Sequence, residues 1–226
     1  MANVDESIRA GESPQRYVRR LAAAKSAAAL AALKGCATHD SASAESAAPK
    51  GCATRDSASA ESAALKGCAT HDNVTAVAGV AQAFRPADVI ILGADTAVVV
   101  DGDILGKPRD DQEAAAMLRR LSGRRHDVMT GVSLRRGAYE VGRVETTAVL
   151  FTALSDEDVK WYVASGEGRD KAGAYAIQGL ASRFIPRIEG SYSNVVGLPL
   201  ACVAELVREI SSTRPVHSSP NRSDPD

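Results

Sequence analysis

The stretch Asp88-Val-Ile-Ile-Leu-Gly-Ala-Asp-Thr-Ala-Val-Val-Val100 carries the strongest fold signal in the chain. Its first part, 88–94, is an apolar run of strand length that gives out at Asp95, and a second apolar run follows at 97–100. Asp101-Gly102 then predicts a turn, because both residue types favour turns. In open α/β sheets ligands bind beyond the carboxyl ends of strands, so an acid at this position is a candidate functional group. Its alternative role is a helix or turn cap.

Helices and strands alternate in the residues that follow. Asp110 or Asp111 starts a helix that ends at Gly123, with Ala114, Met117, Leu118 and Leu121 on one side. Ser155 and Asp158 have the spacing of a capping box, which predicts a helix to about Ser165. The pattern also indicates strands at 126–134 and 141–151, a glycine-rich stretch to 198 and a last helix at 199–210. This alternation predicts an α/β fold.

A tandem repeat interrupts the N-terminal part of the chain. A helix is expected over 11–33, with Ser13 as its cap and Gly35 at its end. The segment Lys34–Pro49 then recurs almost unchanged at Lys50–Leu65, and a third copy begins at Lys66. Small polar residues dominate it, so it cannot bury enough apolar surface to offset the entropy of ordering. We expect one domain over 1–210, interrupted by a mobile low-complexity insertion at 34–72, and a disordered tail at 211–226.

The repeat also contains Cys and His residues. The pairs Cys36/His39 and Cys68/His71 have a spacing compatible with zinc, but the middle copy has Arg55 in place of the histidine. We therefore interpret them as passengers of the duplication.

Composition limits the classes of function. Lys and Arg number 27 against 28 Asp and Glu, and this balance argues against a nucleic-acid partner. The apolar runs are too short to span a bilayer, no export signal is evident, and three of the four cysteines lie in the repeat. A cytoplasmic protein without a membrane partner is expected.

Three further clusters carry chemistry. Gly106-Lys-Pro108 places Lys107 in a rigid turn, where it can contact a phosphate or be merely solvated. Asp170-Lys-Ala-Gly-Ala-Tyr-Ala-Ile-Gln-Gly179 offers a charge at Lys171 and an amide at Gln178 beside small residues that admit a ligand. Ser191-Tyr-Ser-Asn-Val-Val-Gly-Leu-Pro199 is a tight connection ahead of the last helix. Any of these is compatible with a loop that binds nothing.

Taken in order, the clusters resemble those of one known family. Gly-Ala-Asp-Thr, Asp-Gly-(two residues)-Leu-Gly-Lys-Pro, Leu-Ser-Gly-Arg-(one)-His-(three)-Thr-Gly-Val, Asp-Lys-Ala-Gly-Ala-Tyr-(one)-Ile-Gln-Gly and Gly-Ser-Tyr-Ser-Asn-Val-Val-Gly-Leu-Pro follow one another over 88–210. This set is similar to that of the Maf family of nucleotide pyrophosphatases. The resemblance resumes at Val4-Asp-Glu-Ser7 and at Gly11-Glu-Ser-Pro-(two)-Tyr-Val-Arg-Arg-Leu-Ala22, with Lys25 beyond it.

The resemblance implies a fold, an activity and a set of site residues. The fold would be two-lobed α/β with a long twisted mixed sheet flanked by helices, and the assembly a homodimer. The activity would be metal-dependent hydrolysis of dTTP and UTP to the monophosphate and pyrophosphate, with Mg²⁺ or Mn²⁺ as cofactor. Asp95 would accept a proton or hold the metal together with Glu6, two roles that the sequence does not separate. Lys25 and Lys107 would bind phosphates, and Thr96 and Gln178 would govern substrate choice.

The chain also departs from the family pattern. Relative to that pattern it begins after a first strand and a Ser-(one)-Ser-Pro-Arg-Arg loop, so we expect an N-terminally truncated form of the domain. An alternative function is therefore a nucleotide-binding protein of little or no activity, linked to cell-division control. Cleavage between the α- and β-phosphates needs water in line with the phosphorus and neutralised phosphate charge. The intact acid could accept a proton from this water, and the lysines could neutralise the phosphates.

Overall fold

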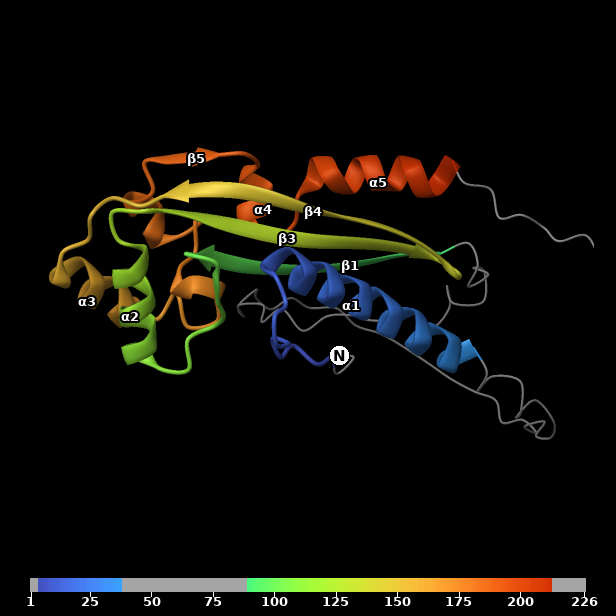
Figure 1. Cartoon of the computed structure of the whole chain (residues 1–226), viewed down its shortest axis with the longest axis horizontal. Helices are drawn as coiled ribbons and strands as arrows, with labels where there is room; N and C mark the ends of the chain where they lie inside the picture. The colour runs from blue at the N-terminus through green and yellow to red at the C-terminus, as the bar shows by residue number, and fades with distance from the viewer. Residues whose placement is uncertain (1–3, 38–88, 213–226) are drawn as a thin grey trace, which may run out of the picture.

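A long twisted sheet is the central element of the molecule (Figure 1). The computed structural model describes residues 4–37 and 89–212. Within them the sheet has the strand order β2-β1-β3-β4-β5, and every pairing is antiparallel. The strands are β1 Ile90–Val100, β2 Asp103–Leu105, β3 Arg125–Arg136, β4 Tyr139–Leu150 and β5 Arg187–Glu189. The α/β class and the long sheet flanked by helices are confirmed, whereas the described strands show no parallel pair of the expected mixed sheet.

Helices cover both faces of this sheet. They are α1 Pro14–Ala37, α2 Asp111–Leu121, α3 Asp156–Ser165, α4 Tyr192–Val196 and α5 Leu200–Ser212, with 3₁₀ turns η1 Ala172–Ala174 and η2 Leu180–Phe184. Alternate residues of β3 point to opposite faces. Met129 packs with Val18 of α1, whereas Val132 packs with Leu206 of α5. A third, larger cluster joins α2 and α3 to the other end of the sheet (Figure 1).

The helix α1 lies very close to the sheet because two strands carry glycine beneath it. A Cβ on Gly93 of β1 would collide with the carbonyl oxygen of Ala22, and a Cβ on Gly131 of β3 would collide with that of Val18. Only a residue without a side chain admits a helix backbone at this distance. The contact fixes the position of α1, and with it the side chains that α1 directs toward β1.

The structure corrects the prediction that Asp95 ends a strand. β1 is one continuous strand of 11 residues, and Asp95 lies in its middle, opposite Gly131 of β3. Asp95 and Thr96 do not interrupt the hydrogen-bond ladder between β1 and β3, because both side chains have partners. Lys25 binds the carboxylate of Asp95, and Thr130 lies 2.9 Å from the hydroxyl of Thr96.

The helices with strong local signals were predicted well. Asp110 caps α2 through the amide of Glu113, and the four predicted apolar residues of this helix are buried. The capping box of Ser155 and Asp158 starts α3, and Gly166 ends it in the left-handed conformation. Elements of three to five residues in the glycine-rich stretch, namely η1, η2, β5 and α4, were not predicted, because they are too short to show periodicity.

Two predicted boundaries also differ from the structure. The helix α1 continues through Gly35 to Ala37, so the first residues assigned to the insertion are helical, and α5 includes the first residues of the expected tail. The remainder of both segments, 38–72 and 213–226, lies outside the described residues, as do His39 and the pair Cys68/His71. Among the helices of the described part, none is long and apolar enough to cross a membrane.

Candidate active site

Five of the predicted site residues line one cavity of about 310 Å³. They come from separate parts of the chain: Lys25 from α1, Asp95 and Thr96 from β1, Lys107 from the loop after β2, and Lys171 from the loop before η1. Among the described pairings, β2 covers only Val98–Val100 of β1. Asp95 and Thr96 are successive residues of a strand and point to opposite faces, so the cavity wraps around this edge of β1.

Lys25 lies between two carboxylates at the centre of the site. Its Nζ is 2.5 Å from Oδ1 of Asp95 and 3.0 Å from Oε1 of Glu6. The Asp95 side chain is only 12% exposed, whereas that of Glu6 is 57% exposed. Glu6 does not line the cavity, and Lys25 connects it to Asp95.

The environment shifts the protonation of this cluster. Burial raises the pKa of Asp95, and the hydrogen bond and charge of Lys25 only partly offset this effect. Burial alone would lower the pKa of Lys25, but its hydrogen bonds to Asp95 and Glu6 outweigh it and raise that pKa. Lys25 therefore stays protonated at neutral pH. Asp95 holds its negative charge less readily than an exposed aspartate, which is a property of a proton acceptor.

On the opposite face of β1, the Thr96 side chain contacts the segment before α5. Its hydroxyl lies 2.9 Å from that of Thr130 and 3.4 Å from the carbonyl oxygen of Gly197. Gly197 has a φ of 123°, which a residue with a side chain adopts only with strain. The predicted connection at 191–199 thus contributes Val195, Val196 and Gly197 to the cavity wall.

The remaining lysines are exposed at the mouth of the site. Lys107 and Lys171 are both exposed, and Nζ of Lys171 is 2.8 Å from Oδ2 of Asp170, which also lines the cavity. Gln178 is exposed too, but it is not among the residues that line this cavity. The structure therefore brings Lys25, Asp95, Thr96, Lys107 and Lys171 together and leaves Gln178 apart.

Two tyrosines were not predicted as part of the site. Tyr175 lines the cavity, and its hydroxyl lies 2.8 Å from Nε2 of the buried His126. Tyr17 of α1 donates a hydrogen bond of 3.1 Å to the carbonyl oxygen of Glu6. Both residues stand within the quoted motifs, but no spacing rule assigns such contacts, because they arise only when distant segments pack.

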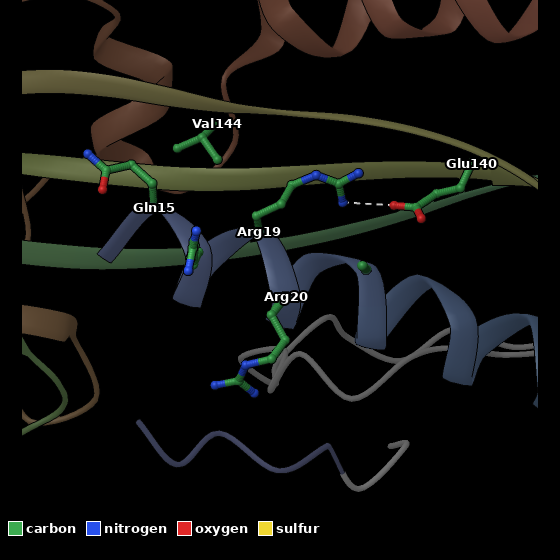
Figure 2. Close-up of a pocket in the computed structure, with 7 residues that line it drawn as sticks. Gln15, Arg19, Arg20, Glu140 and Val144 are labelled. Carbon is green, nitrogen blue, oxygen red and sulfur yellow. Dashed lines mark hydrogen bonds and ion pairs between the residues drawn. The ribbon is translucent and has the colours of Figure 1, made fainter. Parts of the chain in front are cut away.

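A larger groove lies elsewhere on α1 (Figure 2). It has a volume of about 540 Å³ and is lined by Gln15, Arg16, Arg19, Arg20, Ala23, Glu140 and Val144. Arg19 is paired there with Glu140 at 2.7 Å, while Arg20 is paired with Glu12. None of the predicted site residues lines this groove. The smaller cavity is the better candidate, because two acids and three lysines line it.

The acids of the site fit a divalent cation only as a partial ligand set. No group of three or more His, Cys, Asp or Glu side chains with metal-binding geometry occurs among residues 4–37 and 89–212. Glu6 and Asp95 nevertheless converge on the same ammonium group. Mg²⁺ is commonly held by one or two carboxylates together with water and substrate phosphates, so these two carboxylates suit it.

Comparison with known proteins points to one activity among the relatives. The chain is 54% identical over 123 residues to the dTTP/UTP pyrophosphatase of Anaeromyxobacter dehalogenans, a match that covers 53% of this chain and 63% of the relative. It is 54% identical over 129 residues to the protein of the same name from Symbiobacterium thermophilum, covering 57% of this chain and 66% of the relative. For the Escherichia coli O157:H7 protein of that name, the identity is 50% over 139 residues, covering 62% and 70%. The matches thus span somewhat less than two thirds of the first two relatives.

The match to a protein family is more extensive than these pairwise matches. The profile of the Maf-like proteins matches residues 1–210, which include α1, the whole described sheet and the cavity residues. The chain belongs to the Maf family.

Proposed function

We propose that this chain hydrolyses nucleoside triphosphates, dTTP and UTP in particular, to the monophosphate and pyrophosphate. The observation that carries this proposal is the convergence of Asp95, Lys25, Lys107 and Lys171 on one cavity, with Glu6 against Lys25. The name that the relatives share, dTTP/UTP pyrophosphatase, supports the choice of substrate. The triphosphate is a cytoplasmic metabolite, so we place the activity in the cytoplasm.

The reaction follows from the charges that line the cavity. Lys107 and Lys171 bind the triphosphate as point charges. Asp95 takes a proton from a water molecule whose oxygen attacks the α-phosphorus. The bond from this phosphorus to the oxygen that bridges to the β-phosphorus breaks, and pyrophosphate leaves with the electron pair. Lys25 keeps Asp95 in place and balances its charge before the proton arrives.

A divalent cation would complete the neutralisation of the phosphates. Glu6 and Asp95 are the residues that would hold Mg²⁺ or Mn²⁺, and the bound cation would supply positive charge to the phosphate oxygens. Thr96, on the other face of β1, is our candidate for discrimination among bases. Gln178, an exposed residue of the loop before η2, is a second candidate.

The replacement Asp95→Asn tests the assignment of the proton acceptor. The amide keeps the size and polarity of the side chain but cannot take the proton, so kcat should fall by about 10²–10⁴-fold. The measurement is pyrophosphate release from dTTP and UTP with Mg²⁺. Asp103→Asn is the matched control, because Asp103 is exposed on β2 and paired with Arg120 outside the cavity. Unchanged turnover in Asp95→Asn would show that Asp95 is not the proton acceptor.

The same assay separates the enzyme from a protein that only binds nucleotide. Nucleotide binding by the parent chain, measured by calorimetry, without any pyrophosphate release would favour the binding protein.

A further inference from the structure

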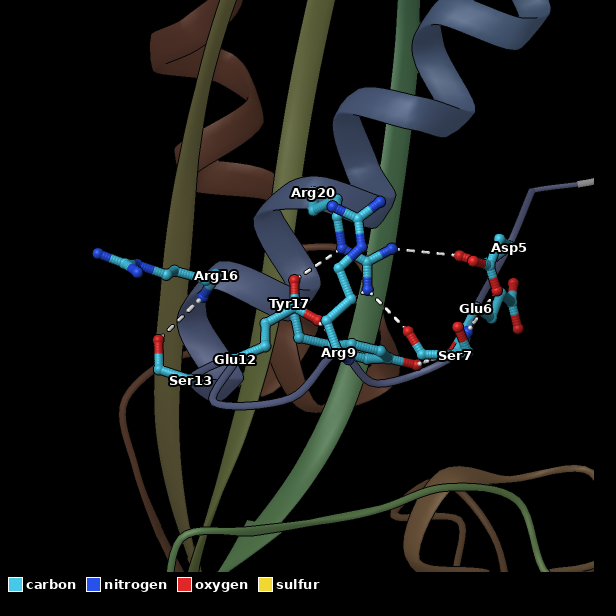
Figure 3. Close-up of polar contacts among 9 residues, drawn as sticks. All are labelled: Asp5, Glu6, Ser7, Arg9, Glu12, Ser13, Arg16, Tyr17 and Arg20. Carbon is cyan, nitrogen blue, oxygen red and sulfur yellow. Dashed lines mark hydrogen bonds and ion pairs between the residues drawn. The ribbon is translucent and has the colours of Figure 1, made fainter.

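One arginine fastens the N-terminal segment to α1 (Figure 3). Nε and Nη2 of Arg20 lie 2.7 and 2.8 Å from the two carboxylate oxygens of Glu12. This two-pronged arrangement is one that a guanidinium makes and an ammonium does not. The side chain of Glu12 is 8% exposed and that of Arg20 is 18% exposed, so the pair is largely shielded from water.

The same guanidinium also binds the backbone on both sides of Glu6. Nη1 donates to the carbonyl oxygen of Asp5 at 3.2 Å, and Nη2 donates to that of Ser7 at 2.9 Å. The carbonyl oxygen between them, that of Glu6, accepts from the hydroxyl of Tyr17 at 3.1 Å. Three successive carbonyl groups are therefore held by two side chains of α1. The Arg20 guanidinium lies 5.5 Å from the centre of the Tyr17 ring, which adds a cation–π contact.

These contacts hold the backbone from which the Glu6 side chain extends. The side chain of Glu6 is more than half exposed, so packing around it contributes little to its position. Its backbone is anchored to α1, and the same helix carries Lys25, whose Nζ is 3.0 Å from Oε1 of Glu6. The anchor and the partner of Glu6 thus belong to one rigid element.

We propose that Arg20, together with Glu12 and Tyr17, is a positioning residue that holds Glu6 against Lys25 and so completes the acidic side of the active site. This inference rests on the proposed function for the role of Glu6. Arg20 is not among the residues that line the cavity, and it acts through the backbone of residues 5–7.

The ion pair between Arg20 and Glu12 remains charged over a wide range of pH. The hydrogen bond from Arg20 lowers the pKa of Glu12 to about 2, and the hydrogen bonds to Glu12 raise the pKa of Arg20. Both groups are therefore ionised from acidic to strongly alkaline pH, so this ion pair does not titrate near neutrality.

The test compares two neighbouring arginines. Arg20→Lys keeps the charge and removes the fork. Arg19→Lys is the matched control, because Arg19 is the adjacent residue of α1 and also forms an ion pair with a glutamate, Glu140 at 2.7 Å, but it points toward β4 (Figure 2). Tyr17→Phe is a milder second variant that removes only the hydroxyl bound to Glu6.

Two readouts are measured on the full chain. Amide hydrogen exchange of residues 4–12, without nucleotide or metal, should accelerate by about tenfold in Arg20→Lys, the effect of losing roughly one charged hydrogen bond. It should accelerate less in Tyr17→Phe and remain unchanged in Arg19→Lys. In pyrophosphate release with Mg²⁺, Arg20→Lys should lower kcat by a similar factor, and the control should not.

A double-mutant cycle shows whether Arg20 acts through Glu6. In a Glu6→Gln background, Arg20→Lys should change kcat by less than about twofold, because the side chain that it positions is already disabled. Additive losses, or parental exchange at residues 4–12 in Arg20→Lys, would overturn the positioning role. A parent chain that releases no pyrophosphate would instead refute the proposed function. The exchange measurement would then show by itself whether Arg20 anchors residues 5–7 to α1.

Discussion

His126 is a buried titratable side chain in contact with Tyr175, which lines the cavity. It is 2% exposed, packs edge-on against Phe151 and lies 2.8 Å by its Nε2 from the hydroxyl of Tyr175. Burial lowers its pKa to about 4, so the imidazole is neutral at physiological pH. Because Tyr175 lines the cavity, its contact with the neutral His126 links that imidazole to one residue of the cavity wall.

The shift in pKa predicts how stability depends on pH. Between pH 6.5 and 4 the unfolded chain binds a proton at His126 and the folded chain does not, so the free energy of unfolding falls as pH falls. Each pH unit in this window costs about 1.4 kcal/mol, or about 2 kcal/mol between pH 7 and pH 5. Urea unfolding at these two pH values measures this loss.

The variant His126→Gln is the reference for that measurement. Glutamine offers a polar atom to Tyr175 but does not titrate, so its loss of stability between pH 7 and pH 5 should be smaller by about the same 2 kcal/mol. An equal loss in the parent and the variant would show that His126 is not the group responsible.

The residues of the site differ in how well the sequence predicted them. Asp95, Thr96, Lys107 and Lys171 stand in short motifs of small and polar residues, and the structure brings them to one cavity. Arg20 stands in the motif Tyr17-Val-Arg-Arg20, but the sequence does not predict its role. Its contacts with residues 5, 7 and 12 depend on how the N-terminal segment folds back on α1.

At the scale of elements, the contact between α1 and the sheet positions the site. Lys25 reaches Asp95 because α1 lies directly on β1 and β3, and the glycines at 93 and 131 permit that approach. Ser26 adds a buried hydrogen bond of 2.9 Å to Ser133 of β3. A change in the height of the helix above the sheet would therefore separate the ion pair.

A single added methyl group tests this contact. In Gly131→Ala the new Cβ would overlap the carbonyl oxygen and carbon of Val18, so the helix or the strand must shift. Overpacking of this kind costs about 1–3 kcal/mol of unfolding free energy, which urea denaturation measures. Gly106→Ala is the control, because nothing lies within 4 Å of a Cβ there. Equal stability of the two variants would mean that the helix adjusts freely.

The sequence predicted the elements with local signals and missed those that depend on pairing. Ser155 and Asp158 fix the start of α3 through their own hydrogen bonds, and these were visible as a spacing. The continuity of β1 through Asp95 was not visible, because it depends on Lys25 and Thr130, which are distant in sequence. Short elements such as β5 exist only because β4 offers a partner strand.

At the scale of the whole molecule, two segments separated along the chain form one unit. The helix α1 ends at Ala37 and β1 begins at Ile90, yet Ala22 and Ser26 of the helix are in contact with Gly93 of the strand. The core around Val18, Ala97, Val99 and Met129 likewise combines residues from both sides of this connection. Residues from both sides of 38–88 thus build the contact between α1 and β1 that holds the described part of the site.

Deletion of one repeat copy, Lys50–Leu65, should therefore leave stability and activity nearly unchanged. Loop closure entropy varies with the logarithm of length, so a connection shorter by 16 residues stabilises the fold by only about 0.3 kcal/mol. For a domain of this size, that is about 1 °C in Tm. Thermal unfolding and pyrophosphate release would be compared among the parent, the deletion and a variant with 16 Gly and Ser residues in place of the copy. A fall in Tm of more than about 5 °C in both variants would correspond to more than 1 kcal/mol, far beyond the loop effect. The repeat would then contribute contacts of its own, and the division into one domain and a dispensable insertion would be wrong.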